Sequence, residues 1–213
     1  GERAFDGCSS LKSIEIPDSV TEIVASALRG CNSLIDVTIF EPKICEATPI
    51  DGDNEYKTRS ARYSFDGIYF IDNLSNRLVC CVKDGIDSYQ IPDSITEIGK
   101  SAFEDCRSLK CIKIPNSVTK IGNWAFSGCS SLESIAIPDS VAKIGDDAFL
   151  LCSSLKSIKM PDSVKKIGSS AFRGCSSLER IKIPNSVTKI GEWAFSGCSS
   201  LKSIEIPDSV TKI

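Results

Sequence analysis

The sequence predicts a repeat solenoid built from β-rich coils, and two regular spacings are the main reason. Cysteines recur at intervals of 23 residues, and prolines keep the same step. A fixed period of this length is typical of a chain in which each unit packs mainly against its neighbours. The recurring positions are Cys106, Cys129, Cys152, Cys175 and Cys198, and Pro115, Pro138, Pro161, Pro184 and Pro207.

The period divides the chain into regular and irregular parts. Cys8–Ile23 matches Cys198–Ile213 at all but one position, which indicates duplication of one module. Both ends of the sequence fall inside a unit, so we expect a fragment of a longer array. The single solenoid fragment, 1–213, consists of repeats at 2–39, an irregular insertion at 40–63, a β-hairpin variant repeat at 64–90 and regular repeats at 91–213.

Within one unit, Ile181 and Ile183 alternate with Lys182, which is the period of a strand with one buried face. Pro184 ends that strand because it has no N–H group to donate. Val187–Ile190 follows, and we expect it to be a second extended piece on the opposite side of the coil.

The rest of the unit should close the coil and fill its interior. Glu192–Gly197 is too short for a full helix, so we expect a helical turn that ends at Gly197 in the left-handed conformation. About six buried apolar side chains per unit contribute ~10–20 kcal/mol, less than the cost of ordering the backbone. Stacking must supply the rest, with parallel strands of successive units in one sheet. The predicted core columns are Cys106, Cys129, Cys152, Cys175 and Cys198, and Phe5, Phe103, Phe126, Phe149, Phe172 and Phe195.

The irregular region contains a second recognisable pattern. Ile68–Ile71 and Arg77–Val82 are β-rich runs on either side of the turn-forming Asp72–Asn76, which predicts a β-hairpin. Cys80 and Cys81 are adjacent, so we expect one buried and one exposed thiol.

Cysteine at a repeated position has three interpretations: metal ligand, disulfide or buried thiol. Side chains stacked in one direction aim poorly for disulfides, and C-x-x-C is absent, so we favour a ladder of buried thiols that includes Cys8 and Cys31. Cys111 is the expected exposed thiol, and Cys45 stays unassigned.

The repeated pattern C-x-S-L-x-x-I-x-I-P-x-S-V-x-x-I-G-x-x-A-F-x-G resembles the BspA-like (Treponema pallidum-type) leucine-rich repeat across 2–39 and 91–213. Asp66–Cys80 is similar to a hairpin variant of that family. The resemblance implies a curved, right-handed solenoid with a parallel sheet on its concave face. It also implies an extracellular or cell-surface protein that adheres to host proteins or other cells.

The composition argues against most kinds of chemistry. The chain has no histidine, which removes His-dependent catalysis, His metal sites and His pH switches. We expect no enzyme activity, no cofactor and no metal. The net charge of −3 gives no case for nucleic acid, and no apolar run approaches the ~20 residues of a membrane span. Trp124 and Trp193 share one unit position, where we expect partial burial against the phenylalanines; contact with a ligand is the alternative.

A protein partner would bind the outward side chains of the concave sheet, where one column is mildly basic. The alternatives are a solvated face without a partner, a structural spacer that displays another domain, and an intracellular interaction scaffold. The hairpin and insertion are a second candidate contact region. The candidate partner-binding residues are Asp36, Thr38, Gln90, Lys113, Lys159, Arg180, Lys182 and Glu205.

Overall fold

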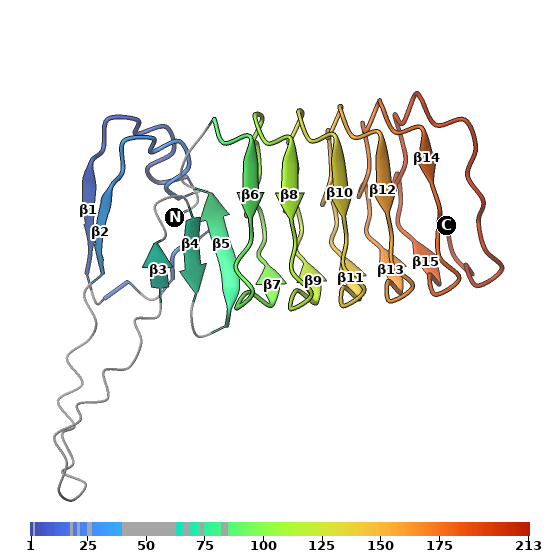
Figure 1. Ribbon diagram of the computed structural model, residues 1–213, viewed down its shortest axis with the longest axis horizontal. Coiled ribbons are helices and arrows are strands. Elements are labelled where there is room, and N and C mark those ends of the chain that lie inside the picture. The colour runs from blue at the N-terminus through green and yellow to red at the C-terminus, as the bar shows by residue number, and fades with distance from the viewer. Residues whose placement is uncertain are drawn as a thin grey trace, which may run out of the picture.

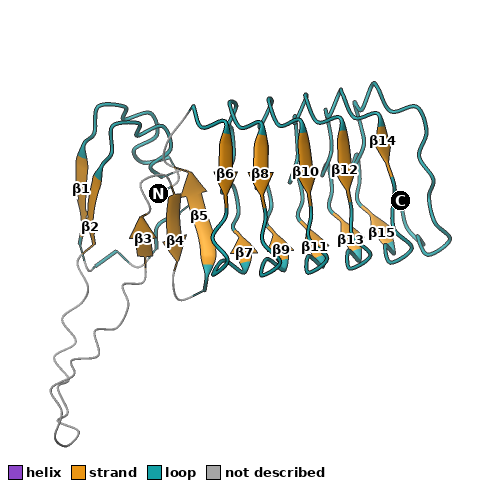
Figure 2. Ribbon diagram, viewed as in Figure 1, coloured by secondary structure: helices purple, strands orange, loops and turns teal. Residues whose placement is uncertain are grey.

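The computed structural model shows a solenoid of successive β-coils (Figure 1). It describes residues 1, 3–17, 19–20, 22–24, 27–39, 63–65, 69–72, 75–81 and 85–213. Within these residues all regular secondary structure is β-strand (Figure 2). The strands are β1 (Ser13–Ile16), β2 (Asp36–Ile39), β3 (Tyr63–Phe65), β4 (Tyr69–Asp72), β5 (Arg77–Cys81), β6 (Ser88–Gln90), β7 (Glu97–Ile98), β8 (Cys111–Lys113), β9 (Lys120–Ile121), β10 (Ser134–Ala136), β11 (Lys143–Ile144), β12 (Ser157–Lys159), β13 (Lys166–Ile167), β14 (Arg180–Ile181) and β15 (Lys189–Ile190).

Each regular coil contributes two strands, and equivalent strands of successive coils pair in parallel, as predicted, in two stacks. The first stack contains β1–β2, β6–β8 and β10–β12–β14. The second stack is an eight-stranded sheet in the order β15-β13-β11-β9-β7-β5-β4-β3. The second extended piece of the coil was predicted, but its pairing was not: it repeats at the same step, so its backbone groups also pair with those of the neighbouring coils and form a second sheet.

The predicted strand and turn of the unit are confirmed. Ile112 is buried and Lys113 is exposed in β8, as alternation requires. The turn after the strand is closed by the Val118 N–H, which donates to the Pro115 carbonyl at 3.1 Å. One contact in this turn joins successive coils: the Ser117 hydroxyl donates to the Ile95 carbonyl at 2.7 Å. Equivalent serine contacts of 2.5–2.7 Å recur in the next four units.

The segment expected to form a helical turn is a run of hydrogen-bonded turns. Phe172 and Gly174 donate their N–H groups to Ala194 and Ser196 of the next coil, both at 2.8 Å. These donors are committed to the neighbouring coil, so they are not available for helical bonds along the chain. Gly197 has φ +76°, which confirms its predicted left-handed conformation.

The phenylalanine and cysteine columns form the centre of the solenoid. The rings of successive phenylalanines from Phe103 to Phe195 lie 4.9–5.5 Å apart and are nearly parallel. The thiols of Cys129, Cys152, Cys175 and Cys198 also donate hydrogen bonds, as Cys152 Sγ does to the Phe126 carbonyl at 3.1 Å. Phe5, which lies in the N-terminal coil, is 44% exposed, so its predicted placement in the core was wrong.

The hairpin lies where the regular period fails, and it joins two cores. Its predicted strands are confirmed in β4 and β5, which pair antiparallel, and β3 adds a further antiparallel strand. Leu78 and Cys81 of β5 belong to the larger apolar cluster, whereas Val79 and Cys80 belong to the smaller, N-terminal one. The expectation that one of the two cysteines is exposed was wrong, because β5 is covered on both faces. Of the irregular insertion predicted at 40–63, residues 40–62, including Cys45, lie outside the described residues.

An ion-pair cluster also connects the N-terminal coils to the main array. Arg29 Nη1 donates to Asp105 Oδ2 at 2.7 Å, and Arg29 Nε donates to Asp6 Oδ1 at 3.2 Å. Burial lowers the pKa of Arg29, but the hydrogen bond to Asp105 and the charge of Asp6 outweigh it and the pKa is raised. The guanidinium therefore stays charged and links coils that are 76 residues apart in the sequence.

A column of glycines sets how closely the coils approach. A Cβ atom added at Gly168 would lie 2.6 Å from the Asp146 nitrogen and even nearer the carbonyl group of Gly145. These are backbone atoms that cannot turn aside, and Gly122, Gly145 and Gly191 meet the preceding coil in the same way. This position therefore requires glycine for close approach rather than for an unusual φ.

We predict that Gly168→Ala lowers the free energy of unfolding by about 3 kcal/mol, because the coils must separate to admit the methyl group. Urea denaturation would measure the loss. Gly197→Ala is the matched control: its φ is strained but the nearest atom lies at 3.4 Å, so about 1 kcal/mol is expected. Equal losses in the two variants would contradict the close-contact role.

Candidate partner-binding face

The outer side of the first stack presents the candidate partner-binding residues. All eight are exposed: Asp36, Thr38, Gln90, Lys113, Lys159, Arg180, Lys182 and Glu205. Their strands keep the buried isoleucines on the opposite side, as in the exposed–buried–exposed pattern of β8 and β12. The geometry therefore places these side chains in solvent, where a partner could reach them.

Strand register arranges the candidate residues in columns. Gln90 pairs with Lys113 and Ala136 pairs with Lys159 along one column. In the same column Lys182 bridges to Glu205, so its positive charge has an acidic neighbour in the next coil. The face is thus a regular backbone grid on which the exposed chemistry changes from coil to coil.

The adjacent column of the same face carries small side chains and one cation. Ser134 pairs with Ser157, and Ser157 pairs with Arg180. Cys111 occupies this column and is exposed, as predicted. Small residues leave the backbone accessible, while Arg180 supplies a planar group able to donate several hydrogen bonds to one partner.

The candidate residues predicted from the sequence do not include a further charged column, which lies on the second stack. We call it the lysine ladder, and its signal in the sequence is the recurring lysine of V-x-K-I. Its members are Lys120, Lys143, Lys166, Lys189 and Lys212.

The cysteines of the repeat position mostly lie in the core. Cys31, Cys129, Cys152 and Cys175 are buried, and Cys106 and Cys198 are half-buried. Cys8 is exposed, so its predicted burial was wrong; it lies in the outermost coil. Among the described residues, no group of three or more His, Cys, Asp or Glu side chains is placed to hold a metal ion.

Burial raises the pKa of the Cys152 thiol from 9.0 to about 12. The thiol ionises near pH 9 in the unfolded chain but stays protonated in the folded chain. Its contribution to the stability is therefore fully present below pH 9 and is lost as the pH rises toward 12. We predict that this thiol alone costs about 2 kcal/mol of stability near pH 10.5.

Urea denaturation at about pH 8 and about pH 10.5 would measure this loss in the parent and in Cys152→Ala, which should lose less over the interval because it lacks the buried thiol. Cys111→Ala, at an exposed position, is the control and should follow the parent. If Cys152→Ala loses as much stability as the parent, the buried thiol is not responsible.

The two tryptophans differ in their surroundings. Trp124 is half-buried, as expected, and the Lys100 ammonium lies 5.1 Å from its ring centre. Trp193 is 67% exposed, so its predicted partial burial was wrong. Both have φ near +55°, and the Arg173 guanidinium lies 5.9 Å from the Trp193 ring centre.

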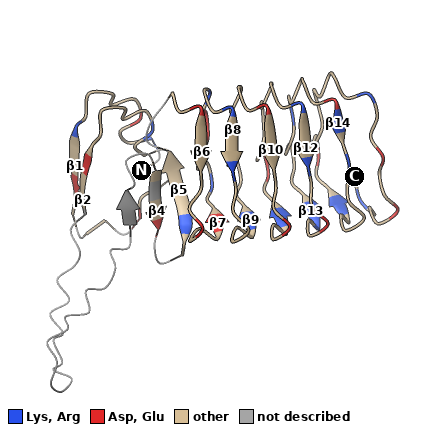
Figure 3. Cartoon of the chain, viewed as in Figure 1, with Lys and Arg blue, Asp and Glu red and all other residues tan. Residues whose placement is uncertain are grey.

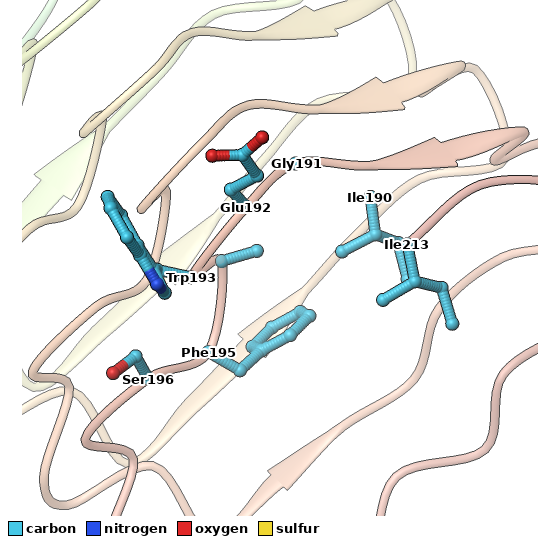
Figure 4. A pocket seen from close by; sticks show the side chains of 8 residues that line it. Ile190, Gly191, Glu192, Trp193, Phe195, Ser196 and Ile213 are labelled. Atoms are coloured by element: carbon cyan, nitrogen blue, oxygen red, sulfur yellow. The ribbon is translucent and has the colours of Figure 1, made fainter.

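A hollow opens at the last coil, lined in part by Ile190, Trp193, Phe195 and Ile213 (Figure 4). In earlier coils the equivalents of Phe195 are covered by the ring of the next unit, as Phe172 is covered by Phe195. The hollow therefore has the apolar chemistry of a stacking surface between coils.

Taken together, the period, the stacked parallel strands and the exposed strand face define a leucine-rich-repeat solenoid. The family model for the BspA type leucine-rich repeat region matches six copies at residues 1–47, 79–179 and 142–213. The chain belongs to the BspA-type leucine-rich repeat family. No curated protein sequence matches it.

Three solved structures show the same fold. A leucine-rich cell surface protein from Faecalibacterium prausnitzii is 34% identical, with a TM-score of 0.71, over 96% of this chain and 50% of that one. The leucine-rich repeat protein of T. pallidum is 32% identical, with a TM-score of 0.61, over 70% and 71%. A leucine-rich repeat protein from Bacteroides ovatus is 29% identical, with a TM-score of 0.59, over 99% and 41%. This chain thus spans half or less of the Faecalibacterium and Bacteroides proteins.

The family is one of repeat scaffolds that generally mediate protein interactions. In the part of the chain that the structure describes, no helix has the length and apolar character to cross a membrane.

Proposed function

We propose that this chain is a non-enzymatic protein-binding module of a cell-surface repeat protein, with the outer face of the first stack as its contact surface. The observation that carries the proposal is the contrast between the two sides of the strands. The inward positions of β8, β10, β12 and β14 are all isoleucine. The outward positions change among cysteine, serine, lysine, alanine and arginine, as a surface that distinguishes partners requires.

A location at the cell surface has support from one of the similar structures. The Faecalibacterium prausnitzii protein, which matches 96% of this chain at 34% identity, is described as a cell surface protein. Adhesion to host proteins or to other cells is the activity that such a location would serve. A repeat grid of this kind suits an extended partner, because equivalent side chains recur with every coil.

Binding of the purified chain to a panel of immobilised extracellular matrix proteins and to intact cells would test the proposal. The triple variant Lys113→Ala, Lys159→Ala, Lys182→Ala removes three exposed charges from the candidate face. We predict about tenfold weaker binding, since each exposed charge contact contributes up to about 1 kcal/mol.

The matched control removes three exposed lysines from a column that precedes the first-stack strands: Lys110→Ala, Lys156→Ala and Lys202→Ala. It should bind within about twofold of the parent. Equal weakening in both triple variants would contradict the assignment of the face. A chain that binds none of these targets would instead support the alternative of a structural spacer.

A further inference from the structure

The lysine ladder is a column of one charge on the second stack. Strand register places Lys120, Lys143, Lys166 and Lys189 on successive rungs, and Lys189 bridges to Lys212. The isoleucine that follows each of the first four lysines is buried, so the lysines lie on the outer side of the sheet. Figure 3 shows the blue strands of the ladder along one edge of the solenoid.

Most of these ammonium groups form no ion pair with an acidic side chain that the structure describes. Lys120 pairs with Glu97 at 2.8 Å, at the end of the ladder nearest the hairpin. Lys143, Lys166 and Lys189 make no ion pair with any described residue. Positive charge therefore accumulates on successive rungs without a compensating ion pair from the described part of the chain.

The neighbouring side chains leave the lysines as the available donors. In several coils the residue that precedes the ladder lysine is threonine, and its hydroxyl already donates a hydrogen bond to the preceding coil. Thr119 donates to the Thr96 carbonyl at 3.2 Å, and Thr188 donates to the Lys165 carbonyl at 3.3 Å. Lys165 itself is exposed and adds one more cation beside the column.

Another charged column of the solenoid, distinct from the lysine ladder, carries charges of both signs. Lysine and glutamate alternate along it, and Lys156 pairs with Glu133 at 3.3 Å. Like charges directly opposite one another on adjacent strands are destabilising, so alternation relieves the repulsion that the ladder retains. An anionic partner would relieve it in the ladder. The members of the alternating column are Lys110, Glu133, Lys156, Glu179 and Lys202.

We propose that the lysine ladder binds a linear sulfated or carboxylated polysaccharide that lies along the solenoid axis. Successive rungs are about 5 Å apart, as the spacing of the stacked phenylalanine rings shows. Lysine is a compact charge on a flexible stem, so a row of lysines can follow anions of variable position on sugar rings. The ladder thus provides a continuous cationic track on a chain whose net charge is −3.

The same geometry disfavours the other polyanions. An extended acidic peptide presents side chains on one face about every 6.7 Å, which does not match the rungs. Proteins that track single-stranded nucleic acid combine a basic groove with aromatic stacking platforms. The ladder strands β9, β11, β13 and β15 each consist of lysine and isoleucine alone.

Titration of the chain with fluorescent heparin, a linear sulfated polysaccharide, tests the proposal at two salt concentrations. The triple variant Lys143→Gln, Lys166→Gln, Lys189→Gln should bind heparin about tenfold more weakly and with a smaller dependence on salt. The control variant Lys110→Gln, Lys156→Gln, Lys202→Gln carries the same change in net charge and should remain within about twofold of the parent. Circular dichroism establishes that both variants keep the parent fold.

Three outcomes would overturn the proposal: no heparin binding by the parent, equal weakening in both triple variants, or tighter binding of single-stranded DNA or polyglutamate than of heparin. The result is independent of the protein-binding face. Changes at Lys113, Lys159 and Lys182 should leave heparin binding unchanged, because they lie on the first stack.

Discussion

The contact between equivalent residues of neighbouring coils is the interaction on which the rest of the structure depends. Backbone groups, serine hydroxyls and thiols all donate to the adjacent coil, and the glycine column allows the backbones to come close enough for these bonds to form. No coil has enough apolar surface to fold alone. Stability therefore arises between units, and side chains at one repeat position are forced into columns.

The columns explain both the core and the surface of the molecule. Inside, they produce stacked phenylalanine rings and a line of hydrogen-bonded thiols. Outside, the side chains at one repeat position lie in a row along the surface. On the first stack these rows vary from coil to coil, and on the second stack one row consists of lysines. The hairpin keeps this order across the irregular region, since β5 pairs with β7 in the second sheet and packs against both cores.

Much of this could be predicted from the sequence because the period itself reports which residues are equivalent. The buried isoleucines, the proline turn, the hairpin and the exposure of Lys113 follow from local alternation and turn chemistry. The buried pair Cys80 and Cys81 could not be predicted that way, since alternation assumes that one face of a strand is open. The exposure of Trp193 could not be predicted either, since Trp124 holds the same repeat position with the same φ and is half-buried. The second extended piece, Val187–Ile190, was predicted, but two paired residues per coil are too few to predict that these pieces form a sheet of their own.

The most direct test of the account is the deletion of one whole period. Removing residues 130–152, which are 23 residues, joins Cys129 to Ser153 and restores the repeat pattern. Thermal unfolding followed by circular dichroism should show a cooperative transition close to that of the parent. Removing residues 130–151 instead shifts every later column by one residue and should abolish that transition. Similar unfolding of the two deletions would contradict the claim that contacts between equivalent residues hold the fold together.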